Sequence, residues 1–143
     1  MVTVTWVPPM QFMESAARGS TVMMDAAQGD GGTGTGPTPM ESLLLALAGC
    51  TGMDVVSILR KMRMPLEELR IDVSGERAAD HPRVFTSIHL HYALRGAGLD
   101  AESVEKAVTL SLDKYCSVAA MLKRTAKIAY DISVSAETSA VAS

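Results

Sequence analysis

The chain has 143 residues, a net charge of −3 and 48% hydrophobic residues. This length suits a single domain, which we predict over residues 1–135, and the hydrophobic content is too high for a disordered chain. The charge balance shows no basic surplus, so nucleic acid is not an expected partner. The N-terminus alternates like a strand and lacks the regions of a signal peptide, so we expect a cytoplasmic protein. Residues 136–143 are predicted to form a disordered tail.

The first quarter of the chain predicts a small antiparallel sheet. Strand-like segments lie at residues 2–6, 11–15 and 21–25. They are followed by a glycine-rich stretch from Gly29 to Pro37. This stretch lacks the Gly-Lys-Ser/Thr ending of a phosphate-binding loop, so we interpret it as a linker or a mobile flap.

A long helix is predicted to begin at Thr38 and to end before Pro65. Thr38 can serve as the N-cap, Pro39 suits the first helical position, and Glu41 completes a capping box. Apolar residues cover most of the first half, so we expect this half to be buried on nearly all sides. Its longest uncharged apolar run, residues 42–53, is shorter than the roughly 20 residues that cross a bilayer, which favours a soluble protein.

The rest of the chain predicts two strands, a helical region and a last strand. In the second of these strands Val84, Thr86 and the alternate residues after them should face the core, with Phe85 on the polar face. The helical region should begin at the N-cap Asp100. The predicted segments are strands 69–73, 84–94 and 128–134, and helices 100–115 and 117–124. This order indicates an α+β fold in which antiparallel sheets flank two helices.

His89 and His91 form a His-x-His pair on one strand, a spacing that can bind metal. No third ligand is close in the sequence. We therefore expect no metal site and no bound cofactor.

Cys50 and Cys116 are the only thiols of the chain. Gly49 and Gly52 flank Cys50 inside the predicted helix, where each glycine costs about 1 kcal/mol relative to alanine. Close approach of another element is the usual reason for such glycines. In a reducing compartment a pair of cysteines is more often catalytic, redox-active or metal-binding than a structural disulfide. The alternative, that Cys50 is a small buried hydrophobe, remains open.

A reactive cysteine must be ionised, because the thiolate is the nucleophile. Cys116 can be stabilised as a thiolate by a helix N-terminus. Cys50 needs a cation from elsewhere, and Arg18 is the best candidate, although a solvated arginine at a strand end is the more common situation. Glu41 lies nine residues from Cys50, a rotation of about 180° on a regular helix, so its capping role is favoured over a catalytic one.

Two motifs together resemble the OsmC/Ohr family, and the similarity extends over nearly the whole chain. They are Gly36-Pro37-Thr38-Pro39-Met40-Glu41-Ser42 continuing to Ala48-Gly49-Cys50-Thr51-Gly52-Met53-Asp54, and Lys114-Tyr115-Cys116-Ser117-Val118-Ala119. The resemblance implies an OsmC-like intertwined homodimer. In such a dimer antiparallel sheets wrap around two long central helices, and the sites lie at the subunit interface.

The resemblance also implies a thiol peroxidase that reduces organic hydroperoxides without a bound cofactor. Cys50 would be the peroxidatic thiol, Cys116 the resolving thiol, and a dithiol such as dihydrolipoamide the reductant. Active peroxidases of the family carry a glutamate directly after the proline that heads the cysteine helix. Here Met40 stands at that place and Glu41 follows it, and Arg18 would supply the family's arginine.

The sequence of residues 51–57 resembles a less characterised OsmC-like branch more closely than it resembles the established peroxidases. Two other functions therefore stay open. One is a protein that binds a small hydrophobic ligand in the same interface pocket, and the other is a slow redox sensor.

Overall fold

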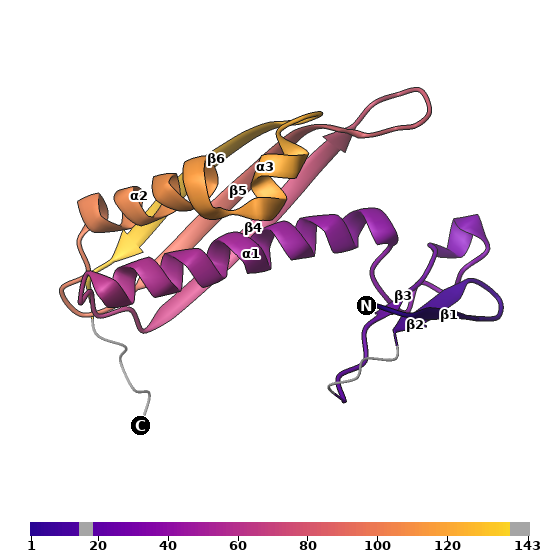
Figure 1. Ribbon diagram of the computed structural model, residues 1–143, viewed down its shortest axis with the longest axis horizontal. Helices are drawn as coiled ribbons and strands as arrows, with labels where there is room; N and C mark the ends of the chain where they lie inside the picture. Colours follow the sequence, from indigo (N-terminus) through magenta and orange to yellow (C-terminus); the bar gives the residue numbers. More distant parts are fainter. Residues whose placement is uncertain (15–18, 138–143) are drawn as a thin grey trace. The chain divides into compact units, whose positions relative to one another are not determined.

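The computed structural model describes residues 1–14 and 19–137. It divides the chain into two compact units, Met1–Leu43 and Leu44–Ser143, which we describe separately (Figure 1). The assignment of residues 1–135 to a single domain stays a prediction. Most of the predicted tail, from residue 138 onward, lies outside the described residues.

The first unit contains the small antiparallel sheet that the sequence predicts. Its strands are β1 (Val4–Val7), β2 (Gln11–Glu14) and β3 (Met23–Met24), in the order β1-β2-β3. Large apolar side chains on these strands are exposed, including Val4, Trp6 and Phe12. Among the described residues of this unit the only buried side chain is that of Asp25. The unit therefore has no hydrophobic core of its own in the part that the structure describes.

The glycine-rich stretch is an organised loop, which corrects the prediction of a linker or mobile flap. The Asp25 carboxylate accepts hydrogen bonds from the backbone N–H groups of Ala26, Thr33 and Thr35 at 2.8, 3.2 and 3.2 Å. It also accepts from the hydroxyls of Thr33 at 2.6 Å and Thr35 at 3.1 Å. The hydroxyl of Thr33 is the largest cause that holds the pKa of Asp25 well below its ordinary value. One carboxylate thus ties the loop, including the short 3-10 helix η1 (Gln28–Asp30), to the end of β3.

Helix α1 (Pro39–Lys61) begins with the predicted capping box. The backbone N–H of Thr38 donates to Glu41 Oε2 at 2.8 Å, and the backbone N–H of Glu41 donates to Thr38 Oγ1 at 3.2 Å. These reciprocal bonds satisfy two donors that a helix start would otherwise leave unpaired. The predicted start of the helix is therefore confirmed.

Fewer sides of α1 are buried than the sequence predicts. The buried residues follow a single stripe, Leu47, Thr51, Val55 and Leu59. Leu45 and Met53 are exposed by 58% and 75%, so the expectation of burial on nearly all sides is wrong for the chain taken alone. By length and composition alone, this one helix could cross a membrane. Its buried stripe packs in the core of the second unit, as expected for the central helix of a soluble protein.

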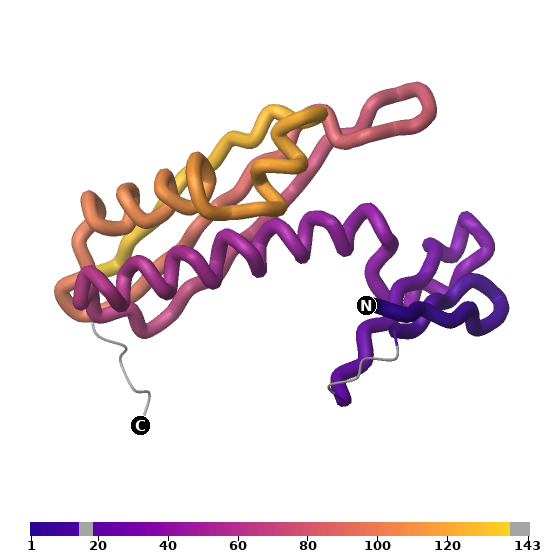
Figure 2. The backbone as a smooth tube through the Cα atoms, viewed as in Figure 1, coloured from indigo at the N-terminus to yellow at the C-terminus, as the bar shows by residue number. Residues whose placement is uncertain are grey.

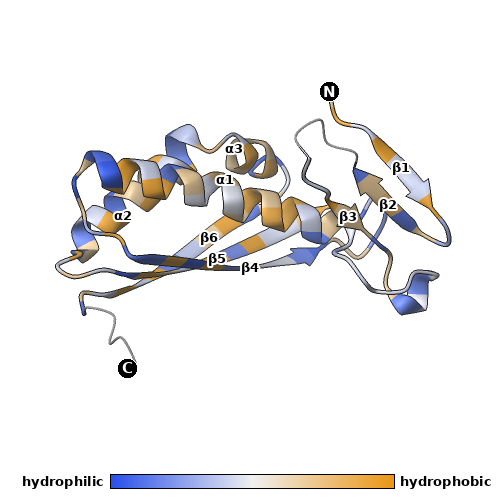
Figure 3. Ribbon diagram, turned by 90° about the horizontal axis from the view of Figure 1, so that it is seen from below, coloured by the Kyte–Doolittle hydropathy of each residue, from blue (hydrophilic) through white to orange (hydrophobic). Residues whose placement is uncertain are grey.

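The second unit is a two-layer arrangement of a sheet and helices. The sheet contains β4 (Glu68–Arg77), β5 (Phe85–Arg95) and β6 (Lys127–Ser135), with β5 in the centre. Strands β4 and β5 are antiparallel, whereas β5 and β6 are parallel. This corrects the prediction of purely antiparallel sheets. Parallel neighbours need a long crossover, and the helical segment between β5 and β6 provides it on one face of the sheet (Figures 1 and 3).

A β-bulge changes the predicted faces at the start of β5. The pairing register shifts between Glu76 and Arg77, so that Arg77 lies opposite Phe85. The bulge turns the Phe85 ring into the core, where it is 5% exposed, and leaves Thr86 exposed. A Cβ on Gly75 would lie only 2.8 Å from carbon atoms of the Phe85 ring, so a glycine at this position makes room for the ring. The predicted inward positions of Val84 and Thr86 are therefore wrong, whereas those from Ile88 to Leu94 are confirmed.

The crossover contains α2 (Ala101–Leu110), the π-helical turn η2 (Ser111–Tyr115) and α3 (Ser117–Leu122). The tube in Figure 2 shows these segments following one another over the sheet. The predicted N-cap is confirmed, because Asp100 Oδ1 accepts the backbone N–H of Ser103 at 2.7 Å. The backbone N–H of Cys116 donates a hydrogen bond to the carbonyl oxygen of Ser111 at 2.8 Å, which closes the π turn. It therefore ends at the second cysteine.

Candidate functional site

The structure brings the two predicted cysteines together inside the second unit. Cys50 lies in the middle of α1 and is half-buried, and Cys116 lies between η2 and α3 and is 2% exposed. Both thiols are free. Interaction with Cys50 is among the causes that raise the pKa of Cys116. The two sulfur atoms therefore belong to one site.

Burial raises the pKa of the Cys116 thiol to about 11. Cys116 is the N-cap of α3, and its Sγ accepts the backbone N–H of Ala119 at 3.4 Å. This bond lowers the pKa, as the sequence predicts, but burial outweighs it. Cys116 is thus held as a neutral thiol in the reduced protein.

An apolar groove of about 730 Å³ runs along the exposed side of α1. Gly49 and Gly52 line it, with Met53, Val56 and Leu69. A Cβ on Gly52 would lie 3.2 Å from Ile71 Cδ1, which confirms close approach at that glycine. A Cβ on Gly49 would meet nothing within 4 Å, so within this chain Gly49 leaves the groove open beside Cys50. Arg60 and Lys61 supply positive charge at the end of α1.

Two further predicted site residues are Arg18 and Glu41. Arg18 lies outside the described residues. Glu41 uses its carboxylate and its backbone N–H in the capping box at the start of α1. A catalytic role for either residue stays a prediction.

A chain of buried hydroxyl groups lies beside the two thiols. Thr51 Oγ1 is 2.9 Å from the Tyr92 hydroxyl and 2.7 Å from Ser111 Oγ. Ser111 Oγ donates to Asp54 Oδ2 at 2.9 Å. The side chains of Thr51, Tyr92 and Ser111 are fully buried, so these bonds replace water that their hydroxyls have lost. The chain joins α1, β5 and the π turn at the level of the cysteines.

Sequence reasoning missed this hydroxyl chain, although a signal for it exists. Thr51 interrupts the apolar stripe Leu47, Val55 and Leu59 on α1. Ser111 and Tyr92 likewise stand on the core-facing sides of the crossover helix and of β5. Each of these three apolar faces carries a single polar residue. Because a buried hydroxyl needs a hydrogen-bond partner, this pattern predicts that the three side chains contact one another.

The His-x-His pair faces a single carboxylate on the neighbouring strand. His89 Nε2 lies 2.9 Å from Asp131 Oδ1, and His91 Nδ1 lies 2.6 Å from Asp131 Oδ2. Within residues 1–14 and 19–137 no group of three or more His, Cys, Asp or Glu side chains is arranged to hold a metal ion. The pair is therefore part of the polar face of the sheet.

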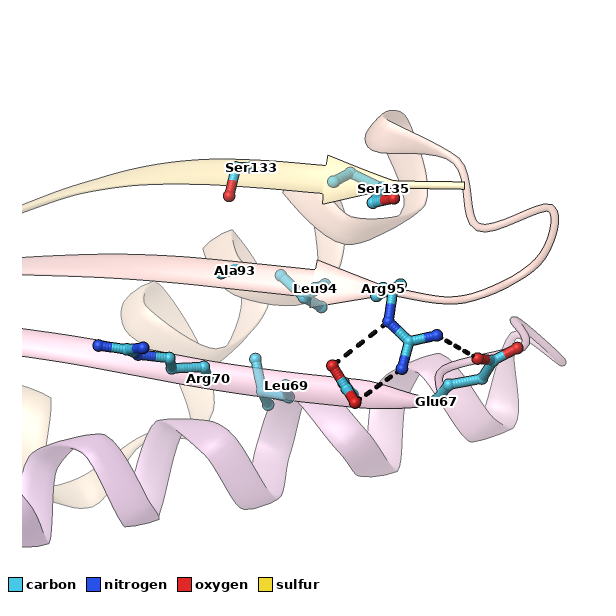
Figure 4. A pocket seen from close by; sticks show the side chains of 10 residues that line it. Glu67, Leu69, Arg70, Ala93, Leu94, Arg95, Ser133 and Ser135 are labelled. Atoms are coloured by element: carbon cyan, nitrogen blue, oxygen red, sulfur yellow. Dashed lines mark hydrogen bonds and ion pairs between the residues drawn. The ribbon is translucent and has the colours of Figure 1, made fainter. Parts of the chain in front are cut away.

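A second hollow, of about 690 Å³, lies around Arg95 at one end of the sheet (Figure 4). Arg95 forms ion pairs with Glu67 at 2.5 Å and with Glu68 at 2.7 Å. Hydrogen bonding to Arg95 lowers the pKa of Glu68, and hydrogen bonding to Glu68 raises the pKa of Arg95. Because this guanidinium is already paired, we place the functional site at the thiols.

The fold is that of a known family. Residues 31–131 match the family model described as OsmC-like protein, and the chain belongs to this family. It is 40% identical over 131 residues to Protein YhfA of Escherichia coli strain K12, covering 92% of this chain and 95% of that protein.

Solved structures show the same fold. A hypothetical protein from Aquifex aeolicus superposes with a TM-score of 0.78 and 29% identity, over 94% of this chain and 96% of that one. An organic hydroperoxide resistance protein OsmC from Legionella pneumophila superposes with a TM-score of 0.71, over 94% of this chain and 97% of that one. Its 15% identity makes this second likeness one of fold.

Proposed function

We propose that the protein is a thiol peroxidase that reduces organic hydroperoxides through Cys50 and Cys116. The observation that carries the proposal is a half-buried thiol, Cys50, on the helix whose Gly49 and Gly52 line an apolar groove, together with a second, buried thiol. Membership of the family, which includes cysteine-based peroxidases, supports it. So does the fold shared with a protein described as an organic hydroperoxide resistance protein.

In the first step the Cys50 thiolate attacks the distal peroxide oxygen. The O–O bond breaks, the alcohol leaves after it takes up a proton, and Cys50 becomes a sulfenic acid. The groove beside Gly49 and Gly52 accommodates the organic group, and its apolar lining favours an alkyl or aryl hydroperoxide over hydrogen peroxide. Arg18 is the residue we propose to stabilise the thiolate, and Glu41 would act only through that arginine.

In the second step Cys116 Sγ attacks the sulfur of the Cys50 sulfenic acid. An S–S bond forms, the S–O bond breaks, and the hydroxyl group leaves as water with the proton of the Cys116 thiol. An external dithiol, for which the family suggests dihydrolipoamide, then reduces the disulfide. The cycle converts one hydroperoxide and one dithiol into an alcohol, water and one cyclic disulfide.

We also propose that the working form is a cytoplasmic homodimer. Leu43 and Leu45 at the start of α1, which lie outside the groove, and the exposed apolar side chains of β1 and β2 need cover that the described chain does not give them. A second copy would supply it. Light scattering at micromolar concentration should give twice the chain mass, and a stable folded monomer would contradict this assignment.

Steady-state consumption of cumene hydroperoxide with dihydrolipoamide tests the activity. The wild type should consume the peroxide, and Cys50→Ser should not. Normal consumption by Cys50→Ser would remove the peroxidase assignment.

A binding protein or slow redox sensor at the same site is the second candidate. The observation that favours it is the engagement of Glu41 in the capping box, with Met40 at the position where active peroxidases carry their glutamate. In that case the wild type would form the disulfide with excess peroxide but turn over no faster than free cysteine.

A further inference from the structure

A serine, a histidine and an aspartate contact one another on the polar face of the second unit's sheet. His91 on β5 lies opposite Asp131 on the parallel strand β6, and Ser133 follows two residues further along β6, on the same face. His91 Nδ1 is 2.6 Å from Asp131 Oδ2, and His91 Nε2 is 3.4 Å from Ser133 Oγ. The imidazole therefore lies between a carboxylate and a hydroxyl group, with one ring nitrogen on each.

The carboxylate determines which way the protons of this cluster point. An ionised carboxylate only accepts hydrogen bonds, so Nδ1 of His91 carries the proton that it donates to Asp131. In the neutral ring Nε2 is then an acceptor, and it faces the hydroxyl group of Ser133. This contact is long, as catalytic hydrogen bonds often are before a substrate is bound. The three side chains thus have the order and the tautomer of a Ser-His-Asp triad.

Ser133 also lines the hollow of about 690 Å³ at this end of the sheet. The residue opposite it on β5 is Ala93, whose short side chain leaves space beside the hydroxyl group (Figure 4). Two arginines and two glutamates line the same hollow, so its positive and negative side chains are equal in number. This balance favours an uncharged ligand over an anion or a cation. The hydroxyl group therefore faces a space that suits a small neutral molecule.

We propose that Ser133, His91 and Asp131 form a second site, separate from the thiols, that hydrolyses short uncharged esters. Ser133 Oγ attacks the carbonyl carbon of the ester while its proton passes to His91 Nε2. The bond to the leaving oxygen then breaks, and the leaving alcohol takes up the proton from His91. A water molecule, deprotonated by His91 in the same way, releases the acid and restores Ser133. Asp131 is the positioning residue, because it holds the ring of His91 in the required tautomer.

The exposure of the three side chains determines which esters can react. The side chains of His91 and Asp131 are 34% and 55% exposed, and Ser133 is exposed as well. Water is therefore not excluded, and the electrostatic stabilisation that a closed site gives to the transition state is small here. Esters with a good leaving group depend least on this stabilisation. We therefore expect activity toward aryl esters such as p-nitrophenyl acetate and none toward amides.

The test follows release of p-nitrophenol from p-nitrophenyl acetate in a Cys50→Ser/Cys116→Ser parent, because thiols also cleave this ester. Ser133→Ala and His91→Gln should each lower the rate at least about tenfold. The double variant Ser133→Ala/His91→Gln should be no slower than the slower single variant, because the two residues act as a unit. His89→Gln is the matched control, since His89 contacts the other oxygen of the same carboxylate, and it should keep at least about half of the rate. Thermal unfolding of each variant is recorded alongside.

A Ser133→Ala variant that keeps the parent's rate would show catalysis by exposed imidazoles alone and overturn the proposal, as would equal losses in His89→Gln and His91→Gln. The wild-type chain gives an independent check with a fluorophosphonate, which bonds to an activated serine oxygen with loss of fluoride. Peptide mapping should place the adduct on Ser133, and His91→Gln should prevent it. Absence of this adduct would contradict the site. Neither measurement uses a hydroperoxide, so their failure is distinct from failure of the proposed peroxidase activity.

Discussion

The two thiols are held by two different kinds of helical segment. Cys50 occupies a regular turn of α1 and is half-buried, and the preceding residue, Gly49, lines an open apolar groove. Cys116 ends a π-helical turn, fully enclosed and tied by its backbone to Ser111. π turns are rare and occur often at functional sites. The difference fits the proposed division of labour, in which the first thiol meets the substrate and the second resolves the sulfenic acid.

The most direct way to break this comparison is to remove the enclosed thiol. Cys116→Ser should leave the first oxidation of Cys50 intact but reduce turnover with dihydrolipoamide by about a hundredfold, because the sulfenic acid has no partner and is overoxidised. Dimedone labelling after one equivalent of hydroperoxide should then mark Cys50. Labelling of Cys116 in a Cys50→Ser variant would reverse the two roles.

A second prediction concerns the pH dependence of Cys116 in the wild type. With its pKa raised to about 11 by burial, its alkylation should increase about tenfold per pH unit between pH 7 and 10. The sign follows from the thiolate being the reactive form, so a raised pKa moves reactivity to higher pH. Mass spectrometry of the Cys116 peptide measures it, with the unfolded protein in urea as control. A midpoint near 8.5, the ordinary value for a cysteine, would contradict the enclosure we describe.

A third prediction concerns the hydroxyl chain that joins the two segments. Thr51→Val keeps the shape but leaves the hydroxyls of Tyr92 and Ser111 with one partner fewer in the core. The free energy of unfolding should fall by about 2 kcal/mol in urea titrations. Thr109→Val is a matched control, because its half-buried hydroxyl donates only to carbonyl groups of its own helix. Equal losses in the two variants would show that the buried chain contributes nothing special.

The smallest expected effect distinguishes the two glycines beside Cys50. Gly49→Ala should stabilise α1 by about 0.5–1 kcal/mol, because its Cβ meets nothing within the chain. Gly52→Ala should gain less, because its Cβ would press on Ile71. Urea titrations of the two variants at equal protein concentration measure the difference. A loss of stability in Gly49→Ala would contradict an open groove and indicate that another surface covers this glycine.

Local signals in the sequence predicted most of the fold. The capping box of Thr38 and Glu41 located the start of α1, and the N-cap Asp100 located the start of α2. These succeeded because each depends on residues only three positions apart. The parallel pairing of β5 with β6 depends on which edge of β5 remains free for a strand that arrives after a long crossover, and no local pattern reports this.

The sequence predicted the two candidate nucleophiles of the site but not the buried hydroxyl chain beside them. The two cysteines stand out because they are the only thiols and carry the family motifs. The buried chain of Tyr92, Thr51, Ser111 and Asp54 joins residues up to 60 positions apart, and each alone looks like an ordinary core or surface residue. The bulge that turns Phe85 inward likewise depends on the pairing between two strands. Such features emerge from tertiary contacts.

The intact mass of the protein after one equivalent of cumene hydroperoxide tests the central claim most directly. We predict the loss of two hydrogen atoms, with peptide mapping that joins Cys50 to Cys116 through a disulfide. An unchanged mass, or stepwise addition of oxygen with both thiols unlinked, would contradict the two-thiol cycle.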